Sequence, residues 1–267
     1  MTWCPQGPAL LFCPADRPDR YAKAADRADV VILDLEDGVA PADKAAARRA
    51  LTEVVLDPAR TIVRVNPAGT DDHRLDLAAL AATSYDVVML AKTESAAQVA
   101  ALSPRRVVAL CETPLGVLAA AEIAATPATV AMMWGAEDLL AAMGGRSSRD
   151  AGGRYRGVAV HARSAVLIAA SALGRPAIDA VHLDIADVEG LRGEASDAAA
   201  CGFEATACIH PAQVDVVRAA YRPSAGEVDW AQRVLAAAAV SPGVFAFEGT
   251  MVDAPVLRQA ERILQRA

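Results

Sequence analysis

The sequence predicts a (β/α)8 barrel followed by a short helical extension. Eight short runs rich in Val, Ile and Leu recur along the chain, and each precedes a longer amphipathic or alanine-rich segment, as in parallel sheets covered by helices. The runs are apolar throughout rather than alternating, which indicates burial on both faces. The length of 267 residues is close to the about 250 residues typical of such barrels.

The predicted strands are ALLFC (9–13), VVILDL (30–35), TIVRV (61–65), DVVML (86–90), RVVAL (106–110), TVAMMW (129–134), AIDAVHL (177–183) and ATACI (205–209). Periodicity alone also allows an open doubly wound sheet. The polar character of the strand ends favours the closed barrel, because all of its parallel strands end at one rim.

Helices are predicted between these runs. The segment PADKAAARRALTEVVL places Pro41 at the first helical position, where the missing N–H of proline is tolerated. TPLGVLAAAEIAA (113–125) predicts another helix, and GGRSSRDAGGRYRG (144–157) predicts a mobile glycine-rich loop beside the rim.

The rhythm of strand and helix stops near residue 222, which predicts a barrel domain over 1–222 and an extension over 223–267. Within the extension, RPSAGEVDWAQRVLAAAAV predicts one helix, SPG (241–243) a turn, and the last 24 residues end in a second helix.

Composition excludes several classes of partner. The net charge is −7, the isoelectric point is near 5.2, and no Lys/Arg stripe is present, so neither nucleic acid nor an anionic membrane is an expected partner. The five cysteines are scattered without a CxxC pair, which argues against a disulfide framework and a structural zinc site. Without a signal-like leader or a long apolar run, we expect a soluble, cytoplasmic protein.

Ionisable and polar side chains follow almost every predicted strand, and they should converge on the rim where barrel enzymes place their sites. These are Glu36, Asp37, Arg64, Asn66, Lys92, Glu112, Asp138, Asp184 and His210.

Two of these carboxylates, Glu112 and Asp138, suit a Mg²⁺ site, because magnesium binds few protein ligands and keeps waters and substrate oxygens in its other positions. The competing interpretation is that each caps a helix that begins nearby. No GxSxG, HExxH, Walker A or GxGxxG motif points to another chemistry.

Arg64 lies within an apolar strand, where an unpaired charge is costly, so it should face either a carboxylate partner or an anionic substrate. Lys92 could form a Schiff base, but a hydrogen-bonding or ion-pairing lysine is the commoner case.

Eight motifs, in this order, make the chain resemble the citrate lyase β-subunit-like proteins of the HpcH/HpaI aldolase superfamily across nearly its whole length. They are LLFCPADRPDRYAKA, LDLEDGVAPADKAAAR, VRVN, AKTES, ETPLGV, WGAEDL, CIHPAQ and FEGTMVDAPVLRQAERIL.

The resemblance implies a barrel that assembles into trimers or hexamers and binds Mg²⁺ through Glu112 and Asp138. It implies that Arg64 contacts the oxygens of a 2-oxo acid such as glyoxylate or oxaloacetate, and that the substrates are acyl-CoA thioesters. Asp253, in GTMVDAP, would enter the site of a neighbouring subunit and act as the acid/base.

The same resemblance places Glu36 and Asp37 beside the metal-bound waters, with Asp34 anchoring the strand end. It also makes the basic residues of DRPDRYAKA candidates to bind the phosphates of coenzyme A. These are Arg17, Arg20 and Lys23, and a solvated basic helix is the alternative.

We therefore expect a Mg²⁺-dependent carbon–carbon lyase that reversibly cleaves a 3-hydroxyacyl-CoA of the malyl-CoA or citryl-CoA type into an acyl-CoA and a 2-oxo acid. Three alternatives remain open at this stage. They are a lyase subunit that acts on a carrier-bound citryl thioester within a complex, a malate-synthase-like or thioesterase activity, and an aldolase that acts on free hydroxy-oxo acids.

Overall fold

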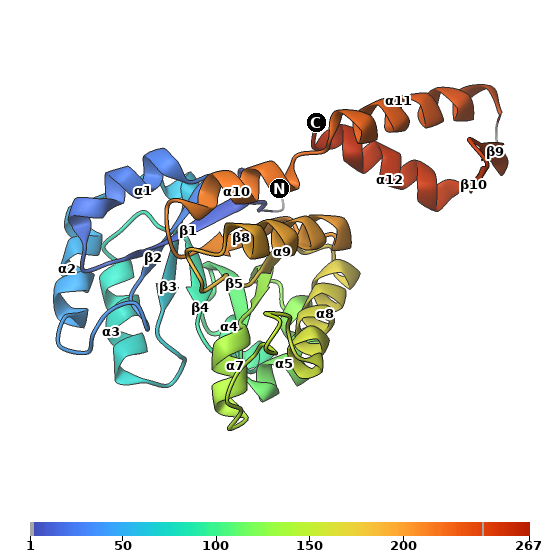
Figure 1. Cartoon of the computed structure of the whole chain (residues 1–267). Coiled ribbons are helices and arrows are strands. Elements are labelled where there is room, and N and C mark those ends of the chain that lie inside the picture. The colour runs from blue at the N-terminus through green and yellow to red at the C-terminus, as the bar shows by residue number, and fades with distance from the viewer. Residues whose placement is uncertain (1–2, 242) are drawn as a thin grey trace. The chain divides into compact units, whose positions relative to one another are not determined.

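The computed structural model describes residues 3–241 and 243–267, which form two compact units divided between Val217 and Arg218. In the first unit, eight parallel strands pair in chain order and β8 pairs back to β1, so the barrel is closed (Figure 1). This confirms the predicted barrel and excludes the open sheet. The strands are β1 (Ala9–Pro14), β2 (Val30–Asp34), β3 (Thr61–Val65), β4 (Val87–Leu90), β5 (Arg106–Cys111), β6 (Thr129–Trp134), β7 (Ala177–Asp179) and β8 (Ala205–Cys208).

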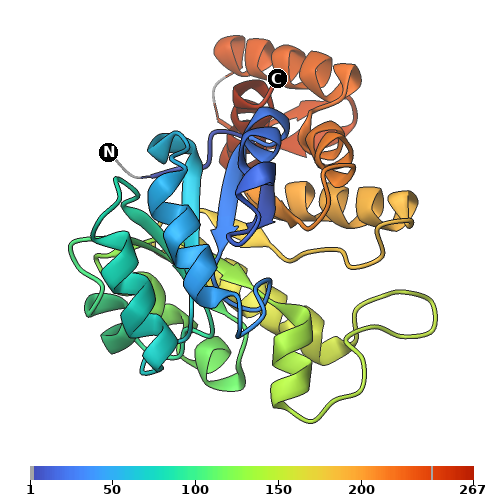
Figure 2. The same cartoon turned by 90° about the vertical axis from the view of Figure 1, so that its left-hand side faces the viewer.

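Helices surround the strands (Figures 1 and 2). They are α1 (Tyr21–Arg27), α2 (Lys44–Glu53), α3 (Asp71–Leu80), α4 (Ala96–Ala100), α5 (Pro114–Leu118), α6 (Ala120–Ala125), α7 (Ala136–Ala142), α8 (Gly157–Ala172), α9 (Val188–Cys201) and α10 (Gln213–Tyr221), with short 3₁₀ turns at η1 (Pro18–Arg20) and η2 (Pro58–Arg60).

Two helix predictions were wrong in detail. Helix α2 begins at Lys44 rather than at Pro41, because the preceding residues form a turn in which the Asp43 N–H donates to the Ala40 carbonyl. The predicted helix over 113–125 is divided into α5 and α6 at Ala119, whose ψ of 4° leaves the helical range.

The barrel interior follows the two-residue period of its strands. Leu10, Ile32, Ile62 and Leu110 belong to one buried apolar cluster. Two residues further along each strand, the same face carries Phe12, Asp34, Arg64 and Glu112. Every second residue of a strand points into the barrel. These inward positions are aliphatic in the core and mostly charged at the C-terminal end of the strands, which makes that end polar.

The second unit is a helical pair with a small hairpin. Helix α11 (Ala225–Val240) is followed by β9 (Phe245–Phe247), β10 (Thr250–Val252) and α12 (Ala254–Gln265). A small core of its own includes Ala231, Val234, Val252 and Ala260. The predicted C-terminal helices are present, whereas the β9–β10 hairpin was not predicted. The expected turn at 241–243 includes residue 242, which lies outside the described residues.

The division between the units falls inside α10, five residues before the boundary expected at 222/223. In the described ranges, no helix combines the length and the apolar composition needed to cross a membrane.

Candidate functional site

Arg64 is held by carboxylates at the C-terminal end of β3. Its Nε and Nη2 donate to the two carboxylate oxygens of Asp34, each at 2.7 Å, and its Nη1 lies 3.1 Å from Glu36 Oε2. The guanidinium also stands 4.8 Å from the centre of the Phe12 ring. Burial alone would lower the pKa of Arg64, but the hydrogen bonds and charge of Asp34, together with the charges of Glu36 and Glu112, hold that pKa above its usual value.

Arg64 therefore has the carboxylate partners that the sequence analysis allowed for. Two of the five N–H groups of the guanidinium donate to Asp34, a third nitrogen forms the ion pair with Glu36, and the side chain is 11% exposed. The group can accordingly bind the oxygens of an anion while its own position is fixed by Asp34.

Lys92 lies at the centre of the acidic site. Its ammonium contacts Glu36, lies 3.0 Å from Asp37 Oδ2 and 3.1 Å from Asp138 Oδ1. Its backbone N–H donates to Glu112 Oε1 at 3.1 Å. Lys92 adopts φ of 49°, a left-handed conformation that non-glycine residues rarely occupy. One residue thus joins the ends of β2 and β5 to α7, which sequence spacing alone could not reveal.

Glu112 is buried directly against the next strand. A Cβ atom at Gly135 would lie 2.7 Å from Glu112 Oε2, so the absence of a side chain at this position makes room for the carboxylate. Burial, reinforced by the negative charge of Asp138, raises the pKa of Glu112 to about 8. Thr113, and not Glu112, caps α5, which removes the simple capping interpretation for this residue.

The charges of this rim favour the addition of a cation. Five carboxylates gather around the two cations Arg64 and Lys92, and they belong to Asp34, Glu36, Asp37, Glu112 and Asp138. Among the residues described, no group of three or more His, Cys, Asp or Glu side chains is arranged to hold a metal by itself. Two hard oxygen donors from Glu112 and Asp138 fit magnesium, which takes few protein ligands, better than zinc, which takes three or four.

Glu36 and Asp37 support this arrangement from the loop after β2. Burial raises the pKa of Glu36 despite the proximity of Arg64 and Lys92. Burial also acts to raise the pKa of Asp37, but the hydrogen bond and charge of Lys92, together with Glu36 and Arg64, outweigh it and lower that pKa. Asp34 fixes the loop by accepting the backbone N–H groups of Glu36 and Gly38, both at 2.9 Å.

The basic residues expected to bind coenzyme A follow β1 and therefore begin near the same rim. Arg17 pairs with Asp19 at 3.1 Å, whereas Arg20 and Lys23 are exposed in η1 and α1. Their assignment stays a prediction.

Asp253 belongs to the second unit. Its carboxylate accepts the Val256 N–H at 3.4 Å and so caps the start of α12. Its role in catalysis also stays a prediction.

Two predicted strand-end residues make local contacts and are not joined to the rim carboxylates by any contact described. Strand β7 ends at Asp179, which leaves Asp184 exposed in the following loop, where its carboxylate accepts the Ala186 N–H. His210 accepts the Ala212 N–H through Nδ1 at 3.2 Å and shapes a turn. The strand-end acid that the sequence analysis missed is Asp179, which is 4% exposed and pairs outside the barrel with Arg163.

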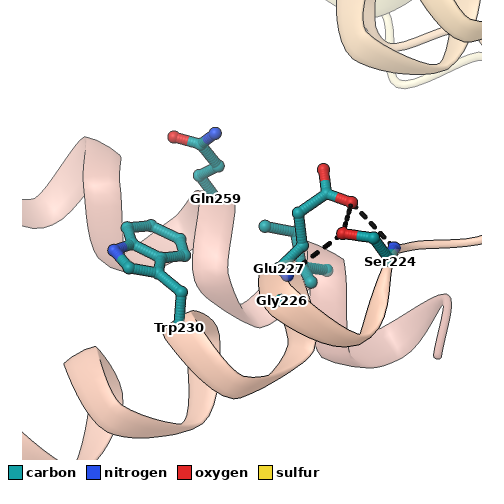
Figure 3. Close-up of a pocket in the computed structure, with 6 residues that line it drawn as sticks. Ser224, Gly226, Glu227, Trp230 and Gln259 are labelled. Carbon is teal, nitrogen blue, oxygen red and sulfur yellow. Dashed lines mark hydrogen bonds between the residues drawn. The ribbon is translucent and has the colours of Figure 1, made fainter.

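A cavity of about 460 Å³ lies within the second unit, between α11 and α12 (Figure 3). It is lined by Ser224, Gly226, Glu227, Trp230, Gln259 and Ile263. The single carboxylate among them, Glu227, is already bonded to the Ser224 hydroxyl and backbone N–H in a capping box. The catalytic chemistry is therefore better sought at the barrel rim.

The fold and the site define a class of protein: a (β/α)8 barrel whose strand ends present hard oxygen ligands beside an arginine, a construction suited to metal-assisted chemistry on a small anion. The chain belongs to the HpcH/HpaI aldolase/citrate lyase family, which matches residues 9–211.

Several relatives are similar over nearly the full length. The citrate lyase subunit beta-like protein of Mycobacterium tuberculosis is 65% identical over 98% of this chain and 96% of its own. The (3S)-malyl-CoA thioesterase of Cereibacter sphaeroides is 35% identical over 97% of this chain and 94% of its own. A crystal structure of CitE from M. tuberculosis, in complex with magnesium, acetoacetate and coenzyme A, superimposes with a TM-score of 0.97 at 64% identity, covering 98% of each chain.

Proposed function

We propose that this protein is a Mg²⁺-dependent carbon–carbon lyase that cleaves, or in reverse forms, a 3-hydroxyacyl-CoA of the malyl-CoA or citryl-CoA type. The products would be an acyl-CoA and a 2-oxo acid such as glyoxylate or oxaloacetate. The observation that carries this proposal is the buried Glu112 carboxylate on a rim where five carboxylates, Asp138 among them, surround only two cations. The complex of the M. tuberculosis relative with magnesium and coenzyme A supports it.

Glu112 and Asp138 would hold the magnesium ion, with Lys92 balancing the remaining charge. Bound magnesium supplies Lewis-acid polarisation of the substrate oxygens at which negative charge develops. Arg64 would bind the carboxylate of the oxo-acid portion through N–H groups that do not bind Asp34, because Asp34 fixes the guanidinium in place. Glu36 and Asp37 would orient water around the metal.

The proton at the α-carbon of the acyl-CoA requires a separate group, and we assign it to Asp253 of a neighbouring subunit in a homotrimer or hexamer. Asp253 would remove this proton in the condensation direction and return one in cleavage. Arg17, Arg20 and Lys23 would offset the negative charge of the coenzyme A phosphates, since all three follow the rim end of β1.

The test is an assay of malyl-CoA, citryl-CoA and citramalyl-CoA with and without Mg²⁺, in which the 2-oxo acid is trapped as a hydrazone. We expect release of the oxo acid that depends on Mg²⁺. Glu112→Ala and Asp138→Ala should each lose both turnover and Mg²⁺ binding measured by calorimetry. Asp253→Ala should lose at least about 100-fold in kcat, the low end for loss of an acid/base, while it binds Mg²⁺ normally; full activity in this variant would exclude the assigned role.

Hydrolysis of the thioester is the second candidate function, because a relative of 35% identity is a (3S)-malyl-CoA thioesterase. Release of free thiol without oxo-acid release would favour this activity. Turnover only with a citryl thioester on an acyl carrier would favour a subunit of a larger lyase.

A further inference from the structure

The segment between α7 and α8, predicted to be a mobile glycine-rich loop, contains a hairpin over residues 148–156. Arg149 and Tyr155 form a β-bridge, and the Arg156 N–H donates to the Ser148 carbonyl at 2.8 Å. Figure 2 shows the whole excursion standing out from the barrel between these two helices. The side chains at the base of this segment contact the barrel at two points.

One contact of the hairpin fixes the first turn of α7. The hydroxyl of Ser148, which is 2% exposed, donates to Glu137 Oε1 at 2.5 Å. Glu137 immediately precedes Asp138, the proposed magnesium ligand. Helix α7 has only seven residues and no side-chain cap at Gly135, so it gains little stability from its own hydrogen bonds. An external contact at Glu137 therefore restrains a helix that is otherwise weakly held.

A second contact fixes the end of β6, on the other side of the same turn. The Tyr155 ring meets the Trp134 ring edge-on, with the centroids 5.2 Å apart and the planes at 69°. Trp134 is fully buried, and its indole N–H donates to Asp179 Oδ1 at 2.6 Å. The hairpin thus contacts residues on both sides of Gly135.

The hairpin is itself anchored to a different part of the barrel. The Arg149 guanidinium stacks on the Tyr155 ring at 3.9 Å and forms a salt bridge with Glu194 of α9. Glu194 also accepts a hydrogen bond from His182 Nδ1 at 2.9 Å, in the loop after β7. The hairpin therefore connects the β6–α7 turn to the β7–α9 region.

We infer that the 148–156 hairpin is a positioning device for the proposed metal ligand Asp138, with Ser148 and Tyr155 as its positioning residues. The inference rests on the proposed function insofar as Asp138 binds magnesium. Neither residue needs to touch the ion or the substrate. Magnesium demands near-ideal octahedral geometry, so a ligand on a loosely held helix turn binds it less well than one whose backbone is fixed.

Calorimetric titration of the full-length protein with MgCl₂ tests the inference. We expect Ser148→Ala and Tyr155→Ala each to weaken Mg²⁺ binding by about tenfold, the low end for residues that orient metal ligands. Tyr155→Phe, which keeps the ring, should retain the affinity of the parent. Glu137→Gln, which keeps the acceptor oxygen for Ser148 but removes the charge, should also retain it. Arg154→Ala is the matched control, since its exposed side chain pairs only with Asp150 of the same hairpin among the contacts described.

Thermal unfolding without Mg²⁺ should be run on the same variants. Ser148→Ala is expected to keep nearly the parental midpoint, so a loss of affinity in this variant cannot be ascribed to unfolding. Parental affinity in both alanine variants would overturn the inference and leave the proposed function standing. Failure of the parent to bind Mg²⁺ at all would overturn the proposed function and the inference with it.

Discussion

The buried pair of Arg64 and Asp34 offers the sharpest test of how the site is built. In Arg64→Leu, Asp34 would keep its backbone hydrogen bonds but lose both bonds from the guanidinium. Both side chains are largely shielded, at 11% and 3% exposure, so solvent does not replace the lost partner. The variant therefore leaves an uncompensated carboxylate at the top of the barrel.

The magnitude follows from this geometry. Removal of one partner from a buried ion pair costs about 3–5 kcal/mol. The two backbone N–H groups that still bind Asp34 place the expected loss near the lower end, at about 3 kcal/mol. For a chain of this size, the loss corresponds to a fall in Tm of about 6–12 °C.

The assay is urea unfolding followed by circular dichroism on four proteins: the parent, Arg64→Leu, Asp34→Asn and the double variant. Because Asp34→Asn removes the orphaned charge, the double variant should lose at least about 1 kcal/mol less than the sum of the single variants. Losses that simply add, within about 0.5 kcal/mol, would refute the reasoning that these side chains form one energetic unit.

Three further predictions address other parts of the molecule. Lys92→Met should lower the free energy of unfolding by about 2 kcal/mol, because the buried Glu36 carboxylate loses its hydrogen bond from the ammonium and the rim carboxylates keep only Arg64 as a counter-charge. Mg²⁺ should raise the Tm of this variant more than it raises the parent's; an equal rise would contradict the charge argument. Gly135→Ala should abolish Mg²⁺ uptake in calorimetry, since its Cβ would displace the Glu112 carboxylate from 2.7 Å; parental affinity would show that Glu112 has room to move. The hydrogen bond that His182 donates to Glu194 raises the pKa of His182 above 6.5. Burial acts to raise the pKa of Glu194, but His182 and Arg149 together hold it below 4.5. The stabilisation from the charge of His182 is therefore complete below pH 6.5, and that from the charge of Glu194 is complete above pH 4.5. The Tm deficit of His182→Gln should accordingly be largest between pH 4.5 and 6.5 and shrink as the pH rises; a deficit that does not change with pH would contradict this coupling.

The barrel and most of its rim could be predicted because both follow from one regularity. Uninterrupted apolar runs mark strands buried on both faces, and the polar residues that end the runs continue the inward alternation. Arg64 and Glu112 continue this inward alternation, as Ile62 and Leu110 do below them. This pattern involves only residues that are close in sequence, so it can be recognised without knowledge of the fold.

The rest depends on contacts between distant segments. The partners of Lys92 come from β2 and α7, so its central position depends on the closed barrel and on a left-handed backbone. Asp179 was missed because β7 has only three residues, and the apolar residues beyond it belong to a loop rather than to the strand. The start of α2 was misplaced because proline tolerates a turn as readily as a first helical position.

The left-handed backbone of Lys92 has a wider consequence. A glycine would adopt this conformation with less strain, by roughly 1–2 kcal/mol, yet it would remove the ammonium that pairs with three carboxylates. Backbone strain thus favours glycine at position 92, whereas the charge balance of the rim favours lysine there. The relief of backbone strain is therefore no larger than the stability lost with the ammonium, so glycine at position 92 would not give a more stable barrel.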